Sequence, residues 1–535
     1  MSGKTNWIKV SADAQARLIN SIPVKWRIAP DKMPPKSRLD VTGFPAESGI
    51  LTQHELDITE SFATDIVRKL IAGEWTSQEV TIAFCKRAAI AHQLTNCLTV
   101  VMFGDAIKRA KEVDEHFAAT GKILGPLHGL PISLKDCFNI RGYPTSVGFT
   151  AWALDPVQTE STVVTLLKKA GAVFYVKTNV PTAMMFAESV NNCYGRTVNP
   201  FNRNLTSGGS SGGEAALIAM RGSCLGVGTD IGGSLRIPAA CVGLYAIRPS
   251  YGRSPHFDAR TALAGQESIS SVNGPISRSL ADLKLWMETI ISMEPWLQDP
   301  KALELPYRAI SLPHKLKLAV LWDNGMVTPT PPVTRALKSV VNTLKVKGYE
   351  IVDWPSKDHS EAAIICKKFF LADGGKSVSK VLQKTGEPWR PELSDYKRAT
   401  DMDVYDLWQL QKERTILQAN YLKRMVEAGI DAILGPTTAY VAPKNGELGT
   451  VSYTNVFSVL DYSSVSFPSG LKADKDLDKR LVDYIPLSDM DTLTQEQYSP
   501  VDVHGLSISL QLTAKRLQEE KLLAMVEKIG EDLVW

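Results

Sequence analysis

Two serines set among glycines, together with one lysine upstream of them, form the most chemically suggestive pattern of the chain. Ser210 lies in the run Gly-Gly-Ser-Ser-Gly-Gly, Ser234 in Gly-Thr-Asp-Ile-Gly-Gly-Ser-Leu-Arg, and Lys135 in Leu-Pro-Ile-Ser-Leu-Lys-Asp. A serine hydroxyl is a weak nucleophile at neutral pH, and it becomes useful only beside a base and beside donors that stabilise an oxyanion. The pattern therefore predicts a nucleophile with its proton relay.

The glycines before Ser234 favour a backbone that can bind such an oxyanion. Because glycine tolerates conformations that other residues avoid, Gly232 and Gly233 allow successive N–H groups to turn toward one point. We expect the tetrahedral oxygen to be bound by the amides of Ile231, Gly232, Gly233 and Ser234. A helix is expected to begin directly after Ser234, and its positive end adds to the same stabilisation.

Lys135 can act as a base only in its neutral form, and a free lysine has a pKa of about 10.4. Residues 130–134 have the apolar character of a short buried strand, which delivers Lys135 at its C-terminal end. Burial among uncharged hydroxyls lowers the pKa of a lysine. One serine could then pass a proton from the other to the neutral lysine.

The elements that must position these residues alternate between strands and helices along most of the chain. A helix capped by Ser161 ends at Gly171, and the next strand covers residues 173–177. Further strands are expected at 316–322, 350–354, 432–434 and 506–512, with helices near 279–291, 333–346, 403–428 and 517–530. The alternation predicts an α/β fold: one large domain with a mixed, mostly parallel central sheet covered by helices on both faces.

The N-terminal residues have a different character from the rest. Five prolines fall within residues 23–50, which suits an extended arm laid over the surface. Helical spacing of apolar residues begins at 66–71. We therefore divide the chain into an extended N-terminal arm at 1–55 and a catalytic domain at 56–535, whose core covers about 80–290.

Composition excludes several classes of function. The chain has 535 residues, 44% of them hydrophobic and 22% charged, as in ordinary globular proteins. A net charge of +3 without a basic cluster argues against nucleic acid as a partner. The seven cysteines are scattered and include no Cys-x-x-Cys pair, which argues against a disulfide framework or a zinc site. No stretch approaches the roughly 20 apolar residues that cross a bilayer. We expect a cytoplasmic protein without metal, cofactor or membrane partner.

The two serine runs and Lys135 together resemble the amidase signature family, and more closely the fungal acetamidases. The resemblance extends over nearly the whole chain. Matching sequence segments lie at residues 48–52, 84–91, 125–136, 195–200 and 274–276. The resemblance implies the amidase signature fold and a serine amidohydrolase. Its substrate is a small-molecule carboxylic amide, which is cleaved to a carboxylate plus ammonia or an amine.

The resemblance also implies roles for individual residues. Lys135 becomes the base, Ser210 the relay and Ser234 the nucleophile that carries the acyl group, with a cis peptide bond between Gly209 and Ser210. Asp230 and Arg236 are expected to brace the loop around the nucleophile. The wall of the substrate pocket is expected to include Met184, Met185 and Phe186.

Other interpretations of the same residues are weaker. Ser211 fits Gly-x-Ser-x-Gly and suggests a hydrolase nucleophile elbow, but residues 199–207 before it are loop-like rather than a strand. That mechanism also needs a histidine, and the four that follow have no recognisable setting: His256, His314, His359 and His504. Cys137, two residues after Lys135, is better explained as a small buried hydrophobe than as a nucleophile.

The sequence leaves several functions open. On the same fold, the acyl-enzyme could tailor a secondary metabolite or transfer its acyl group to an amine, or the chain could be the amidase subunit of a tRNA-dependent amidotransferase. A catalytically silent scaffold is disfavoured because all three catalytic positions are filled. Ala215 and Ala514 stand where relatives tend to carry glycine, so the substrate is not fixed as acetamide. A homodimer also remains open.

Overall fold

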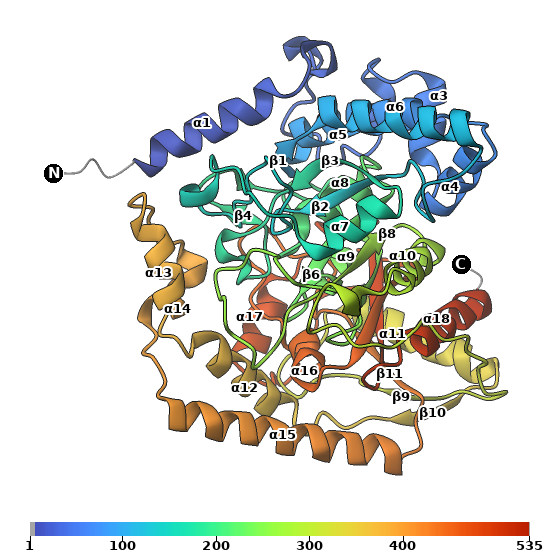
Figure 1. The fold of residues 1–535 in the computed structure, drawn as a ribbon. Helices are drawn as coiled ribbons and strands as arrows, with labels where there is room; N and C mark the ends of the chain where they lie inside the picture. Colours follow the sequence, from blue (N-terminus) through green and yellow to red (C-terminus); the bar gives the residue numbers. More distant parts are fainter. Residues whose placement is uncertain (1–5, 534–535) are drawn as a thin grey trace.

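A mixed sheet of eleven strands runs through the computed structural model, which describes residues 6–533 (Figure 1). From one edge to the other the strands are β1 (Leu98–Val101), β3 (Val173–Thr178), β2 (Pro131–Lys135), β6 (Leu225–Asp230), β8 (Val272–Ser277), β7 (Tyr245–Arg248), β12 (Ser463–Lys472), β13 (Ser507–Ala514), β11 (Ala432–Pro436), β9 (Lys317–Val320) and β10 (Glu350–Asp353). A separate short ribbon pairs β4 (Val190–Asn191) with β5 (Gly195–Arg196). The predicted α/β architecture is confirmed.

Parallel pairing is confined to two groups of strands. Strand β2 is parallel to both β3 and β6, and β9 is parallel to both β11 and β10. The strands between these groups, from β6 through β8, β7, β12 and β13 to β11, pair antiparallel. The parallel arrangement expected from sequence therefore holds around Lys135 and at the far end of the sheet, and the centre differs from it.

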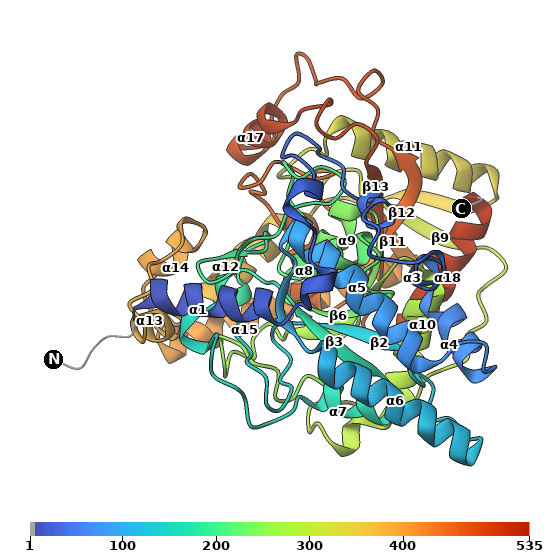
Figure 2. The same ribbon diagram turned by 90° about the horizontal axis from the view of Figure 1, so that it is seen from above.

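Helices cover both faces of this sheet (Figures 1 and 2). Helices expected from sequence are present as α4 (Ala63–Ile71), α5 (Ser77–Thr95), α6 (Phe103–Thr120), α7 (Thr162–Lys169), α9 (Arg236–Val242), α10 (Leu280–Ser292), α11 (Pro331–Val346), α15 (Val404–Glu427) and α18 (Glu519–Leu533). The structure also contains α2 (Phe44–Glu47), α3 (Gln53–Glu60), α8 (Gly212–Ala219), α12 (His359–Leu371), α13 (Lys376–Gln383), α14 (Ser394–Arg398), α16 (Ser452–Leu460) and α17 (Asp489–Gln497). Between residues 6 and 533, no helix is both long and apolar enough to cross a membrane.

The N-terminal arm is not extended throughout, which corrects the expectation for its first part. Residues 7–20 form α1 (Trp7–Asn20), whose buried residues Val10, Ala14 and Leu18 recur at helical spacing. The helix is fixed to the body where the Ser11 hydroxyl donates to the Cys193 carbonyl at 2.7 Å. A helix forms because this apolar stripe can be buried. Residues 1–5, also assigned to the arm, lie outside the described residues.

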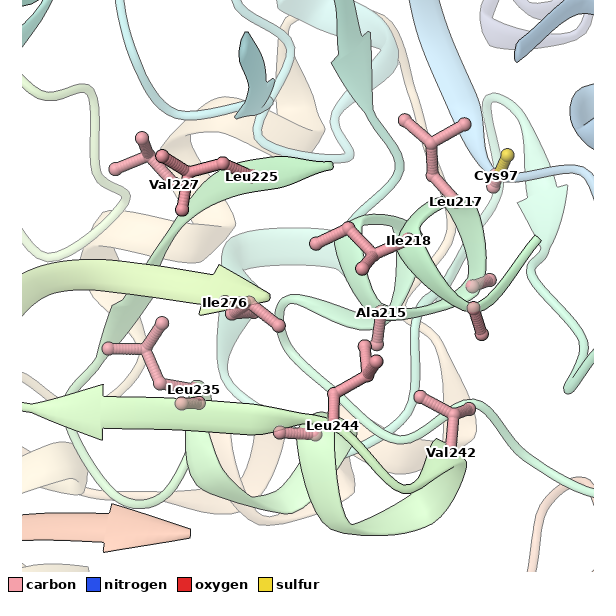
Figure 3. Close-up of a cluster of buried hydrophobic side chains, with 14 of the residues drawn as sticks. Cys97, Ala215, Leu217, Ile218, Leu225, Val227, Leu235, Val242, Leu244 and Ile276 are labelled. Atoms are coloured by element: carbon pink, nitrogen blue, oxygen red, sulfur yellow. The ribbon is translucent and has the colours of Figure 1, made fainter. Parts of the chain in front are cut away.

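Apolar packing beneath the two serine loops fixes where these loops lie. Helix α8 follows Ser210 directly, and its Leu217 and Ile218 are fully buried in the cluster drawn in Figure 3. Leu225 of β6 and Ile276 of β8 belong to the same cluster. Burying each large aliphatic side chain contributes about 1.5–3 kcal/mol, so α8 is held firmly against the sheet.

Candidate active site

Lys135 and Ser210 meet inside the protein. Lys135 is the last residue of β2 and is fully buried, and its Nζ lies 2.7 Å from the Ser210 Oγ. The same Nζ donates to the Thr229 Oγ1 at 2.7 Å. Thr229 comes from β6, the parallel neighbour of β2. The buried strand predicted to deliver Lys135 is therefore confirmed, and the parallel pair supplies one of its hydrogen-bond partners.

Burial lowers the pKa of Lys135 to about 8, although the charges of Cys137, Asp230 and Glu214 act in the opposite direction. Roughly one tenth of the lysine is then neutral at pH 7. Burial also raises the pKa of Glu214 to about 7, against hydrogen bonds from the hydroxyls of Ser133 and Thr178. Glu214 is thus only partly ionised at neutral pH, which limits its stabilisation of a charged lysine.

The loop that carries Ser210 contains a cis peptide bond between Gly209 and Ser210, as the resemblance implied. A side chain at position 209 would meet the backbone, because an added Cβ would lie 2.6 Å from the Glu188 nitrogen. The next residue, Ser211, donates its backbone N–H to the Ser234 carbonyl at 3.2 Å. The Ser211 hydroxyl is buried and donates to the Thr229 carbonyl at 3.3 Å, which leaves it unsuited to be a nucleophile.

Ser210 and Ser234 both line one cavity of about 450 Å³. Ser234 is half-buried, and it follows β6 by four residues. Within residues 6–533 no hydrogen bond joins the two side-chain hydroxyls, although both reach the same space. Cys137 lines this cavity as well, and burial raises the pKa of its thiol to about 11, as expected of an inert cysteine.

The loop before Ser234 is organised by Asp230. Its carboxylate accepts the Gly233 N–H at 2.7 Å and the Leu235 N–H at 3.2 Å. The Gly233 amide is therefore already paired, which corrects its expected place among the oxyanion donors. Gly233 also has a φ of +136°, and an added Cβ would lie 2.2 Å from the Thr454 Oγ1, so only glycine fits there.

Arg236 holds Asp230 in place. Its Nε and Nη2 lie 3.0 and 3.1 Å from the two Asp230 carboxylate oxygens, and both side chains are fully buried. Burial favours the neutral acid, but the Arg236 charge outweighs it and lowers the pKa of Asp230. Arg236 is the first residue of α9, so the helix expected directly after Ser234 is confirmed.

Asp230→Asn is expected to destabilise the protein by about 3–5 kcal/mol, because it leaves the buried Arg236 without its counter-charge. Chemical denaturation of both proteins measures the difference. Glu47→Gln is the matched control, since it breaks the exposed pair of Arg38 and Glu47 and should change the free energy of unfolding by less than about 1 kcal/mol. If Asp230→Asn changed the free energy of unfolding by as little as this control, the role of Asp230 in bracing the loop would be contradicted.

Two of the three expected pocket-wall residues reach the cavity. Met184 and Met185 line it, whereas Phe186 lines a neighbouring cavity of about 650 Å³ that shares Met185 with the first. Sequence reasoning missed Thr229, and it missed the wall formed by residues 256–267. Thr229 belongs to the same glycine-rich run as Ser234, but nothing in the sequence shows which hydroxyl faces a lysine. The sequence of this wall has no helical or strand periodicity from which its position could be predicted.

Comparison with known proteins agrees with this geometry. The family model described as Amidase matches residues 79–523. The acetamidase of Emericella nidulans is 40% identical over 98% of this chain and 98% of its own length, and that of Aspergillus oryzae is 41% identical with the same coverage. Among solved structures, a fatty acid amide hydrolase superposes with a TM-score of 0.94 at 35% identity, covering 98% of this chain and 95% of that one. The chain belongs to the amidase family and is an amide-hydrolysing enzyme.

Proposed function

We propose that this enzyme cleaves carboxylic amides through an acyl group carried on Ser234. The observation that carries the proposal is the 2.7 Å hydrogen bond from the buried Lys135 Nζ to the Ser210 Oγ, in a cavity that Ser234 also lines. A buried lysine whose pKa falls to about 8 supplies a neutral amine near neutral pH. Such an amine is the base that a serine nucleophile requires.

Proton transfer follows this chain of groups. As the Ser234 oxygen bonds to the amide carbon, its proton passes to the Ser210 oxygen, and the Ser210 proton passes to the Lys135 nitrogen. The reverse transfer protonates the amide nitrogen while the C–N bond breaks, because an amide anion is a very poor leaving group. Water then attacks the acyl group through the same relay, which releases the carboxylate and restores Ser234.

The oxyanion of each tetrahedral intermediate lies against the backbone before Ser234. Because the Gly233 amide is bound to Asp230, we assign the donor role to the amides of Ile231, Gly232 and Ser234. Losing one such donor typically costs on the order of a hundredfold in rate. Asp230 and Arg236 act here as positioning residues, since they hold this loop without facing the substrate.

Relatives named acetamidase and fatty acid amide hydrolase act on amides of very different size. The cavity of about 450 Å³ is within the range of pockets for drug-sized ligands and exceeds what acetamide would fill. We therefore infer that the substrates include amides with acyl groups larger than acetyl.

The seven cysteines are all free and buried, which supports a cytoplasmic location.

A fluorophosphonate probe tests the nucleophile directly. The wild-type protein should be labelled, and mass spectrometry of its peptides should place the adduct on Ser234. Ser234→Ala should not be labelled, although its thermal unfolding should match that of the wild type. A panel of acetamide, benzamide, indoleacetamide and acylated amines then defines the acyl group. A folded wild-type protein that is neither labelled nor active on any of these amides would refute the proposal.

A further inference from the structure

His256 brings an imidazole into the cavity that holds Ser210 and Ser234. It lies on an irregular segment that follows β7, outside any helix or strand. Nothing in the proposed proton relay uses this side chain. The residue is half-buried, and within residues 6–533 its buried Nδ1 has no hydrogen-bond partner. Buried polar atoms are normally paired, so an unpaired one beside a reactive cavity requires an explanation.

The backbone around His256 is fixed from two sides. The Asp299 carboxylate accepts the backbone N–H of His256 at 2.6 Å and that of Phe257 at 2.9 Å. Asn273 of β8 donates its side-chain amide to the Pro255 carbonyl at 2.5 Å. Because both anchors lie on the main chain, they fix the point from which the His256 side chain enters the cavity. A fixed main chain limits the positions that the ring can take beside a ligand.

Another histidine with an unpaired nitrogen shows why the location matters. The Nδ1 of His359 is also buried and has no partner in the described part of the chain, but its Nε2 lies 3.0 Å from the Tyr421 hydroxyl beside an apolar cluster. His359 therefore has a packing role and contacts no cavity wall around Ser234. His256 differs because its ring borders the space that the substrate must enter.

Most charged groups around the cavity are already paired with other groups of the protein, although the Asp258 carboxylate, which also lines it, accepts among the described residues only from the Asn139 side-chain amide, at 3.4 Å. Lys301 forms an ion pair with Glu267 at the cavity wall. Arg260 donates to the Thr145 carbonyl at 2.9 Å and stacks over Trp152, and Asp299 is occupied by backbone N–H groups. Burial lowers the pKa of His256 to about 4, so its ring is neutral at the pH of catalysis. The imidazole is thus a neutral hydrogen-bonding group of a cavity whose other charged groups, apart from Asp258, are paired.

The chemistry of a carboxamide identifies the group that a neutral imidazole would bind. When the substrate carbonyl oxygen lies against the backbone donors before Ser234, the remaining polar group of the amide is its nitrogen, which carries N–H donors. A neutral imidazole has one ring nitrogen with a free lone pair, and this is an acceptor for such a donor. The carboxylate of Asp299 is not available for it, because its oxygens accept backbone N–H groups.

We propose that the His256 ring accepts a hydrogen bond from the amide N–H of the bound substrate and thereby selects uncharged amides over the corresponding esters. The inference rests on the proposed function, since it places the scissile carbonyl beside Ser234. His256 is then a substrate-binding residue of the reaction, and it takes no part in the proton relay between Ser234 and Lys135.

The test compares one acyl group with two leaving groups. We expect His256→Ala to lower kcat/KM for benzamide about 10- to 30-fold, and to change kcat/KM for methyl benzoate by less than about twofold, because the ester has no N–H to donate. His256→Gln, whose side-chain oxygen can still accept, should recover part of the benzamide activity. Equal losses for the amide and the ester, or no loss for either, would overturn the proposal.

Two controls separate this inference from others. His314→Ala removes an exposed histidine far along the chain from the cavity-lining residues, and it should leave the amide-to-ester ratio unchanged. Ser234→Ala should abolish turnover of both substrates whether or not His256 binds the amide. If the wild type hydrolyses neither substrate, the proposed function itself fails. If the wild type hydrolyses both substrates but His256→Ala leaves the ratio of kcat/KM for benzamide to that for methyl benzoate unchanged, only this inference fails.

Discussion

Ser234→Ala should lower kcat/KM for amide hydrolysis by a factor on the order of 10⁵, which is the largest effect expected of any single substitution. The hydroxyl is the atom that bonds to the substrate carbon, and removing a nucleophile leaves only the binding groups and backbone donors to accelerate the reaction. The measurement is ammonia release from benzamide at saturating and subsaturating substrate. Both kcat and kcat/KM should fall, while the substrate affinity should change little.

The matched control is Ser271→Ala, which removes a hydroxyl that lines the same cavity. It should keep its activity within about tenfold of the wild type, as expected when a serine contacts substrate without bonding to it. If Ser234→Ala retained more than about one hundredth of the wild-type kcat, with contamination excluded by the fluorophosphonate probe, the nucleophile would have to be another residue.

Sequence alone located the strand that carries Lys135 but not its neighbour β6, and the reason is physical. Strand β6 contains Gly226 and Gly228, which have low strand propensity. They are needed because an added Cβ at 226 would lie 1.9 Å from a Glu214 oxygen, and one at 228 would lie 2.8 Å from Leu235. This strand therefore forms because of contacts with residues far away in the sequence, and a local sequence pattern cannot predict such a strand.

The oxyanion loop shows a similar limit. The glycines before Ser234 correctly indicated an unusual backbone, but the sequence could not show which amides remain free. Asp230 takes the Gly233 N–H, and this choice depends on Arg236 turning back from α9. The wall that carries His256 is likewise fixed by Asp299, which lies far along the chain. Irregular segments held by distant side chains have no periodicity, so their positions follow only from the folded structure.

Lys135→Met should lower kcat/KM by a factor on the order of 10³ and remove the rise of activity with pH. In the wild type, burial lowers the pKa of Lys135 to about 8, and the neutral amine is the active form. Below that pH most of the lysine is protonated, so kcat/KM should rise about tenfold per pH unit and level off above pH 8. Methionine fills a similar volume without a titrating group, and its variant should show a flat profile.

The control is Lys301→Met, because Lys301 also lines the cavity but pairs with Glu267 at its wall. This variant should keep the rise of kcat/KM toward pH 8, since the group that titrates is still present. A Lys135→Met enzyme that kept both its activity and the same rising limb would assign the titration to another group. The lysine would then hold Ser210 in place through its hydrogen bond without taking its proton, and the base of the reaction would have to be sought elsewhere in the cavity.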